Sequence, residues 1–315
     1  MSDGDASGPA TVVLNVPGGG MVSRVQDALG DAEVVVGLDD DRARDAEIML
    51  VLSREREALE RSAVPGVRWL HAFSTGVDGF PLDVIDGRQF TCSRGANAVP
   101  IAEFVLASML AFVKRFPDTW LSGEPERWGF ASLDVLAGKT VGLVGVGAIG
   151  TEVARRALAF DMRVVAFRRR SAAPALSEIE LCDTLDELLA QSDHVVIAAP
   201  ATPETYHLIG ADALAAIKPG AHIVNIARGT LVDQDALIAA LDDGRVACAS
   251  LDTLDPEPLP EGHPLYAHPS VRVSAHVSWS APDTLGPTIS LFAENVRRYR
   301  AGEELHGIVD VEAGY

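Results

Sequence analysis

Short apolar runs alternate with stretches of helical periodicity along almost the whole chain. Near its start, four runs have the length and β-branched content of strands, at residues 10–16, 33–36, 47–52 and 67–72. A second series of the same character occupies residues 140–144, 163–167, 193–199, 221–226, 246–251 and 271–274. Helical segments are expected at 22–29, 98–116 and 151–160. This alternation predicts an α/β protein with doubly wound parallel sheets.

A glycine-rich turn follows the first strand of the second series. Residues 140–144 lead directly into Gly145-Val-Gly-Ala-Ile-Gly150, and a helical segment comes next. The first glycine permits a tight turn, the second lets the backbone approach a pyrophosphate, and the third lets helix and strand pack closely. The N–H groups at the helix start would face the phosphates. The motif predicts a dinucleotide site here, whereas Gly18-Gly-Gly20 lacks the required spacing.

The position that selects the cofactor is basic. Where an acidic residue would meet the ribose 2′-hydroxyl of NAD, the chain has Phe167-Arg-Arg-Arg170. An arginine can pair with the 2′-phosphate of NADP, which a carboxylate would repel. We therefore expect Arg168 and Arg169 to favour NADP(H), with Arg170 facing solvent. The alternative is a solvated basic turn.

Length and composition fit a two-domain globular protein. The 315 residues are enough for two cores, and 48% of them are hydrophobic. No apolar run approaches the roughly 18 residues of a membrane span. Residues 1–10 are small and acidic, unlike a secretion signal, and we expect them to form a frayed tail. Cys92, Cys182 and Cys248 lie far apart in sequence, which indicates core residues in a reducing, cytoplasmic compartment.

The charge balance is strongly acidic. A formal net charge of −19 at pH 7 disfavours nucleic acids and anionic membranes as partners. Two interpretations stay open, an ordinary solvated acidic surface and adaptation to a high-salt cytoplasm.

Polar segments follow several predicted strands, where ligands bind in open α/β sheets. The donors of Ser74-Thr-Gly-Val-Asp78 suit a small carboxylate, although an ordinary polar turn is the alternative. Segments 225–229, 251–260 and 274–279 offer an arginine, carboxylates and a histidine. Hydride transfer to a 2-oxo acid needs an arginine to hold the carboxylate and an acid to deliver the proton. Histidine suits the second task, and a neighbouring carboxylate favours its charged form and fixes the ring.

Other aromatic and histidine residues have less specific interpretations. Trp120 and Trp128, in a loop-rich segment, could contact a second subunit or cover the sheet, and we favour a homodimer contact. His71 ends a predicted strand and could line a pocket. His263 and His268 lack a third clustered ligand, so no metal site is expected.

The motifs together resemble the D-isomer-specific 2-hydroxyacid dehydrogenase family over nearly the full chain. The matching segments, in one order, are 74–78, 136–142, 145–150, 200–205, 225–229, 252–260 and His276. The chain departs from the family pattern at Ser274-Ala275, where Thr-Pro is usual, and at bulky Trp279, where small residues are usual. These departures leave the size of the substrate open.

The resemblance implies a role for each site residue. Arg228 would bind substrate, His276 would be the general acid/base, and Glu257 would pair with the histidine. Gly76 and Val77 would give backbone donors to the substrate carboxylate, within a predicted substrate-binding set of Ser74, Thr75, Gly76 and Val77. Asp252 would meet the nicotinamide amide. The predicted cofactor-binding residues are Gly145, Gly147, Ala148, Ile149, Gly150, Arg168, Arg169, Pro200, Thr205, Ala227 and Asp252.

The resemblance also implies two Rossmann-like domains. A flavodoxin-like, discontinuous substrate domain of residues 1–98 and 284–315 would enclose in sequence a dinucleotide-binding domain of residues 99–283. The expected activity is NADP(H)-dependent interconversion of a small 2-oxo acid and its D-2-hydroxy acid, with NAD(H) as a second option. A dinucleotide-sensing binding protein is the alternative. A dehydrogenase of phosphorylated hydroxy acids is a third hypothesis, for which Arg94 alone supplies little of the required basic cradle.

Overall fold

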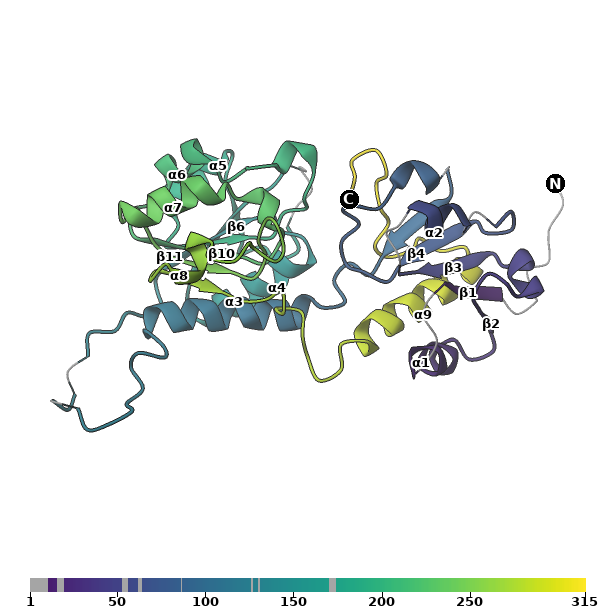
Figure 1. Ribbon diagram of the computed structural model, residues 1–315, viewed down its shortest axis with the longest axis horizontal. Coiled ribbons are helices and arrows are strands. Elements are labelled where there is room, and N and C mark those ends of the chain that lie inside the picture. The colour runs from purple at the N-terminus through teal and green to yellow at the C-terminus, as the bar shows by residue number, and fades with distance from the viewer. Residues whose placement is uncertain are drawn as a thin grey trace. The chain divides into compact units, whose positions relative to one another are not determined.

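The computed structural model in Figure 1 describes residues 11–15, 20–52, 56–61, 64–85, 87–125, 127–129, 131–169 and 174–315. The expected tail at 1–10, most of the Pro17–Gly20 turn and Arg170 lie outside these residues. The chain divides into two compact units. Unit 1 comprises Met1–Asn97 and Ala281–Tyr315, and unit 2 comprises Ala98–Ser280.

Unit 1 is built on a five-stranded parallel sheet of order β2-β1-β3-β4-β5, the flavodoxin-like order. Its strands are β1 Thr11–Asn15, β2 Glu33–Val36, β3 Ile48–Val51, β4 Trp69–Ala72 and β5 Gln89–Cys92. Its helices are α1 Gly20–Leu29, α2 Arg56–Arg61 and α9 Gly286–Ala301, with short 3₁₀ turns at Asp41–Asp45 and Leu82–Ile85. Helix α9, from the far end of the sequence, packs against α1.

Both faces of the unit 1 sheet are covered, which explains why its strands read as continuous apolar runs. Ile48 and Leu50 of β3 pack with Phe292 of α9 on one face. Met49 and Val51 of the same strand pack on the opposite face, with Phe90. The period of two in a strand divides its side chains between these two cores.

Unit 2 has a seven-stranded parallel sheet of order β12-β11-β10-β9-β6-β7-β8. Its strands are β6 Thr140–Val144, β7 Arg163–Phe167, β8 Glu180–Leu181, β9 His194–Ile197, β10 Ala221–Asn225, β11 Val246–Leu251 and β12 Val271–Val273. The chain winds outward from β6 in one direction and then outward from β9 in the other. The carboxyl ends of β6 and β9 therefore mark a topological switch point, where such sheets bind ligands.

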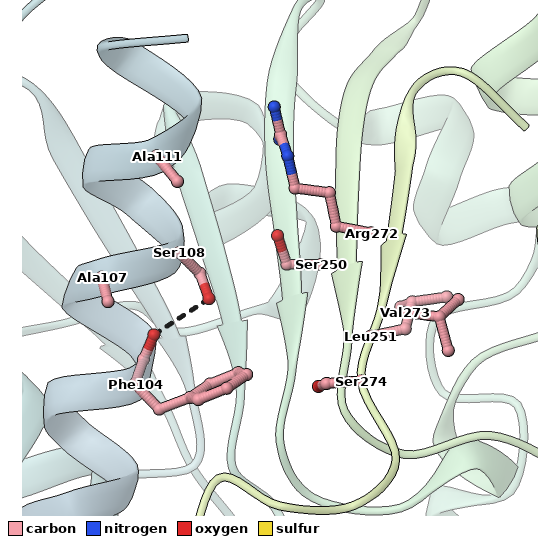
Figure 2. Close-up of a pocket in the computed structure, with 9 residues that line it drawn as sticks. All are labelled: Phe104, Ala107, Ser108, Ala111, Ser250, Leu251, Arg272, Val273 and Ser274. Atoms are coloured by element: carbon pink, nitrogen blue, oxygen red, sulfur yellow. Dashed lines mark hydrogen bonds between the residues drawn. The ribbon is translucent and has the colours of Figure 1, made fainter. Parts of the chain in front are cut away.

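Helices α3 Ala98–Val113 and α4 Ala148–Ala159 cover one face of the unit 2 sheet. Between α3 and the strands β11 and β12, at one edge of the sheet, lies a cavity of about 270 Å³. Figure 2 shows Phe104 and Ser108 of α3 on one side of it and Ser250 and Arg272 on the other. The Ser108 hydroxyl donates to the Phe104 carbonyl at 2.9 Å.

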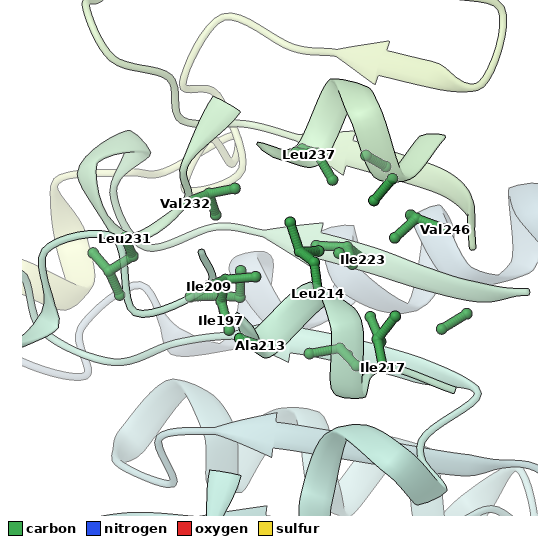
Figure 3. Close-up of a cluster of buried hydrophobic side chains, with 14 of the residues drawn as sticks. Ile197, Ile209, Ala213, Leu214, Ile217, Ile223, Leu231, Val232, Leu237 and Val246 are labelled. Atoms are coloured by element: carbon green, nitrogen blue, oxygen red, sulfur yellow. The ribbon is translucent and has the colours of Figure 1, made fainter. Parts of the chain in front are cut away.

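Helices α5 Leu185–Gln191, α6 Ala211–Ala216 and α7 Gln234–Asp242 cover the other face. Figure 3 shows Ile197 and Ile223 of the sheet together with Leu214 of α6 and Leu237 of α7. The one-turn helix α8 Pro264–Ala267 adds Leu265 to this core. Short 3₁₀ turns occur at Pro203–Thr205 and Gly229–Leu231.

The predicted α/β architecture with two doubly wound parallel sheets is confirmed. Two strands were not predicted. β5 begins with exposed Gln89 and includes Thr91, so it lacks a clear apolar run, and β8 has only two residues, both exposed. Helix α4 begins at Ala148, inside the glycine motif, because the motif's last glycine belongs to its first turn. No described helix is both long and apolar enough to cross a membrane.

Candidate active site

Two of the three glycines in the loop at the end of β6 are required by close contacts with the protein itself. Gly145 has a φ of 96°, and a Cβ there would lie 2.9 Å from the Ala198 carbonyl. A Cβ on Gly150 would lie 2.5 Å from the Gly145 carbonyl oxygen. At Gly147 a Cβ would meet nothing within 4 Å, so this side of the loop is open. The loop thus fits a diphosphate at the start of α4, where Gly147 is the N-cap and Ala148 and Ile149 follow.

The two arginines after β7 have different environments. The Nε and Nη2 atoms of Arg168 are buried, and neither has a hydrogen-bond partner within the part of the chain that the structure describes. Arg169 is more exposed, and its guanidinium lies 3.7 Å from the Glu204 carboxylate. Buried donors without acceptors are costly, so the Arg168 site fits an anionic group.

A turn of residues 225–229 follows β10 and carries Arg228. The Asn225 side chain closes it, because Oδ1 accepts from the Ala227 N–H at 3.1 Å and Nδ2 donates to the Arg228 carbonyl at 2.9 Å. Gly229 lies against the next loop so closely that a Cβ would be 1.9 Å from the Leu254 carbonyl carbon. The turn with Arg228 is therefore packed directly on the loop that leads to Glu257.

Glu257 and His276 form a pair. Glu257 Oε2 lies 2.9 Å from Nδ1 of His276, and Oε1 accepts from the Leu254 N–H at 2.9 Å. The two side chains are 38% and 39% exposed. His276 Nε2 has no hydrogen-bond partner among the described residues. The carboxylate thus fixes one ring nitrogen and leaves the other accessible.

Asp252, at the end of β11, holds the loop that carries His276. Its buried carboxylate accepts hydrogen bonds from the Ser274 hydroxyl at 2.5 Å and from the backbone N–H groups of Val277 and Ser278 at 2.9 Å. Its carbonyl accepts from the His276 N–H at 2.9 Å. Burial raises the pKa of the Asp252 carboxyl, but hydrogen bonds led by that of Ser274 outweigh it and leave the pKa below its ordinary value.

From the sequence, Ser274 was noted only as a departure from the family pattern, and its hydrogen bond to Asp252 was not predicted. The sequence signal that could have found this bond is a hydroxyl two residues before His276, the predicted general acid.

Pro200 and Thr205 form a separate polar turn after β9, in which the Thr205 hydroxyl donates to the Pro200 carbonyl at 2.8 Å. Ala227 lies between Asn225 and Arg228 and donates to the first of them.

The turn Ser74–Val77 follows β4 of unit 1, whereas Arg228, Glu257 and His276 belong to unit 2. The Ser74 hydroxyl donates to the Gly76 carbonyl at 2.7 Å, and the Thr75 hydroxyl donates to the Ser93 carbonyl at 3.4 Å. In the described part of the chain, no acceptor is found for the N–H groups of Gly76 and Val77. Two backbone donors at the end of a parallel strand suit a carboxylate.

Several other residues differ from their first interpretation. His71 is fully buried and bonded to Thr91 and Ser93, so it does not present its ring to a pocket. Trp120 and Trp128 are 68% and 78% exposed, which shows that they do not cover the sheet. Cys182 is only partly buried, unlike the other two cysteines. Within the described residues, no cluster of three or more His, Cys, Asp or Glu side chains could hold a metal ion.

Comparisons with known proteins agree with this architecture. Residues 106–278 match the sequence model of the D-isomer specific 2-hydroxyacid dehydrogenase, NAD binding domain. The glyoxylate reductase of Thermofilum pendens is 32% identical over 281 residues, 85% of this chain and 83% of that protein. The D-3-phosphoglycerate dehydrogenase of Mycobacterium tuberculosis is 36% identical over 302 residues, 91% of this chain but 57% of that protein.

A solved structure is similar over nearly the whole chain. The D-isomer specific 2-hydroxyacid dehydrogenase from Xanthobacter autotrophicus Py2, in complex with NADPH and MES, is 28% identical with a TM-score of 0.85. The match covers 98% of this chain and 100% of that one. From these matches and the glycine loop of unit 2, the chain belongs to the D-isomer specific 2-hydroxyacid dehydrogenase family, oxidoreductases that act on CH–OH donors.

Proposed function

We propose that the protein is an NADP(H)-dependent reductase that converts a small 2-oxo acid into the D-2-hydroxy acid, and catalyses the reverse oxidation. The observation that carries this proposal is the 2.9 Å pair between Glu257 and His276, on loops joined to the Arg228 turn by the close contact at Gly229. In this proposal unit 1 supplies the substrate-binding turn and unit 2 binds the dinucleotide.

The proton in this reaction comes from His276. Glu257 accepts from Nδ1–H, which leaves Nε2 to deliver a proton to the substrate carbonyl oxygen. Arg228 binds the substrate carboxylate and polarises the carbonyl. The reduced nicotinamide, when bound, supplies the hydride to the carbonyl carbon. Gly76 and Val77 add backbone donors for the carboxylate, and the flanking Ser74 and Thr75 shape that turn.

The dinucleotide would lie along the carboxyl edge of the unit 2 sheet. Its diphosphate would meet the loop from Gly145 to Gly150 and the start of α4. Pro200, Thr205 and Ala227 follow β9 and β10 and would border its nicotinamide half. Asp252 would accept from the nicotinamide amide while it holds the His276 loop. These assignments rest on the strand ends that carry the residues.

NADP(H) is proposed as the preferred cofactor because the buried Nε and Nη2 of Arg168 lack acceptors among the described residues. A 2′-phosphate would supply charged acceptors. Replacing Arg168 by serine is expected to raise KM for NADPH about 10- to 100-fold, as expected for loss of a hydrogen bond to a charged group. KM for NADH should change little. Steady-state kinetics with both cofactors measure the difference.

The matched control for this change is Arg169→Ser, because Arg169 is more exposed and lies near Glu204. Its effect on KM for NADPH should be smaller than that of Arg168→Ser. Equal rises in KM for NADPH and NADH in Arg168→Ser would contradict the assignment of Arg168 to the 2′-phosphate.

A homodimer is also proposed. Exposed apolar side chains recur along the segment between α3 and β6, which extends away from the sheet of unit 2 (Figure 1). They are Trp120, Leu121, Trp128, Leu133 and Val135. Several exposed large apolar residues on one segment suit an interface with a second subunit. Light scattering should give twice the chain mass of 33.3 kDa, and a mass of 33.3 kDa would reject the dimer.

Turnover with a series of 2-oxo acids tests the function. Glyoxylate, hydroxypyruvate, pyruvate and a phosphorylated hydroxypyruvate are incubated with NADPH, and nicotinamide absorbance is followed. We expect consumption of NADPH with at least one unphosphorylated acid, and formation of the D-product from hydroxypyruvate or pyruvate, whose reduced products are chiral. Preference for the phosphorylated acid would change the substrate class. NADPH binding without turnover of any acid would instead favour a dinucleotide-sensing protein.

A further inference from the structure

A chain of buried hydrogen bonds in unit 1 ends at the substrate-binding turn. The Trp69 indole N–H donates to the Thr91 hydroxyl at 2.8 Å, and that hydroxyl lies 2.6 Å from Nδ1 of His71. Nε2 of His71 lies 3.0 Å from the Ser93 hydroxyl. All four side chains are completely buried. We infer that His71 and Ser93 are positioning residues that hold the turn Ser74–Val77 in the geometry that binds the substrate carboxylate.

Only one placement of the protons satisfies every donor and acceptor in this series of hydrogen bonds. An indole N–H can only donate, so the Thr91 hydroxyl accepts from Trp69 and gives its own proton to Nδ1 of His71. Nε2 then carries the ring proton and donates to Ser93, whose hydroxyl can donate to the Ala72 carbonyl at 3.5 Å. The opposite tautomer would leave the Thr91 proton without an acceptor among the described residues.

The His71 ring is fixed and uncharged. It packs against Phe292 of α9 with ring centroids 5.1 Å apart, and its edge meets Trp69 at 6.0 Å. Burial lowers the pKa of His71 to about 3. The ring therefore stays neutral across the range in which most enzymes work, and the hydrogen-bond direction does not change with pH.

Ser93 links the buried hydrogen-bond chain to the turn Ser74–Val77. Its backbone N–H is shared between the carbonyls of Ala72, at 3.2 Å, and Ser74, at 3.0 Å. Its carbonyl accepts from the Thr75 hydroxyl at 3.4 Å. The backbone of Ser93 is thus bonded to residues before and within the turn, and His71 fixes the Ser93 side chain. The Gly76 and Val77 N–H groups follow directly in the chain, so we expect their position to depend on that of Ser93.

The inference rests on the proposed role of Ser74–Val77, and it makes a distinct kinetic prediction. Ser93→Ala removes the hydroxyl that meets His71. We expect KM for the 2-oxo acid to rise about tenfold, the effect of one lost buried hydrogen bond. KM for NADPH should stay within about twofold, and kcat should change less than KM, because Arg228 and His276 are untouched. Ser93→Thr, which keeps a hydroxyl, should restore most of the substrate affinity.

The control for a general loss of stability is Val25→Ala, which removes two buried methyl groups from the core of the same unit. It should lower the melting temperature without raising KM for the 2-oxo acid. An unchanged KM in Ser93→Ala would overturn the inference while leaving the proposed function intact. A rise in KM equal to that of Val25→Ala would overturn it as well. If wild-type protein reduces no 2-oxo acid, the proposed function fails and the positioning role is rejected with it.

Discussion

Replacing His276 by asparagine is expected to lower kcat by a factor on the order of 10² to 10⁴, the range for loss of a general acid. The reason is geometric, because the 2.9 Å contact with Glu257 holds Nδ1 and leaves Nε2 as the nitrogen that can deliver a proton. The asparagine amide N–H can donate a hydrogen bond to the Glu257 carboxylate, but the amide cannot transfer a proton to a forming alkoxide. The measurement is kcat at saturating 2-oxo acid and NADPH.

Two further variants separate chemistry from binding. His306→Asn makes the same change at an exposed histidine and should leave kcat unchanged. Glu257→Gln keeps a hydrogen-bonding group near Nδ1 but removes the negative charge, so its loss of kcat should be smaller than that of His276→Asn. The NADPH dissociation constant should stay near its wild-type value in all three. A His276→Asn enzyme that retains more than about a tenth of wild-type kcat would contradict the role of general acid.

The glycine loop shows what the sequence can predict. Its strand, its turn and the following helix are adjacent in the chain, so local pattern alone located Gly145 at the end of a buried strand. The steric demand at Gly150 is also local, because it comes from the Gly145 carbonyl, whereas the demand at Gly145 comes from Ala198, which follows β9. Only the helix boundary was misplaced.

Asp252 shows what the sequence could not predict. Its carboxylate is occupied by Ser274, Val277 and Ser278, which are 22 to 26 residues further along the chain. That contact depends on β11 and β12 lying side by side in the sheet, which no local pattern specifies. The same reason applies to Arg168 and Arg169. They are adjacent in sequence and were predicted together, but only the fold brings Glu204 near one of them.

A pair of buried histidines in unit 2 should make the protein sensitive to acid. His194 of β9 and His222 of β10 face each other with their Nδ1 atoms 3.2 Å apart, and Nε2 of His222 lies 2.9 Å from the Ser250 hydroxyl. Phe112 of α3 stacks on His222 at 4.7 Å. Burial lowers the pKa of His194 to about 4, against a smaller opposing effect of Asp193. Burial also lowers the pKa of His222 well below its ordinary value, with His194 and Arg272 acting in the same direction.

Because both histidines have lowered pKa values in the folded protein, acid should lower its free energy of unfolding. In the unfolded chain both rings have an ordinary pKa of about 6.5 and take up protons that the folded protein does not bind. Their contribution to stability is therefore complete above about pH 6.5 and is lost as the pH falls toward the folded values. At about pH 5 each ring should cost the folded state about 2 kcal/mol, or about 4 kcal/mol for the pair. Urea unfolding at about pH 7 and pH 5 measures this difference.

Other groups also titrate in this range, so the decisive comparison is with a variant that cannot take up these protons. In His194→Gln/His222→Gln, the free energy of unfolding should be lower than wild type at about pH 7, because the ring packing against Phe112 is lost. Between about pH 7 and pH 5 it should fall by about 4 kcal/mol less than wild type does. His306→Gln is the matched control and should keep the wild-type pH dependence. Equal losses of stability in wild type and the double variant would show that these two rings are not the groups that bind protons on unfolding.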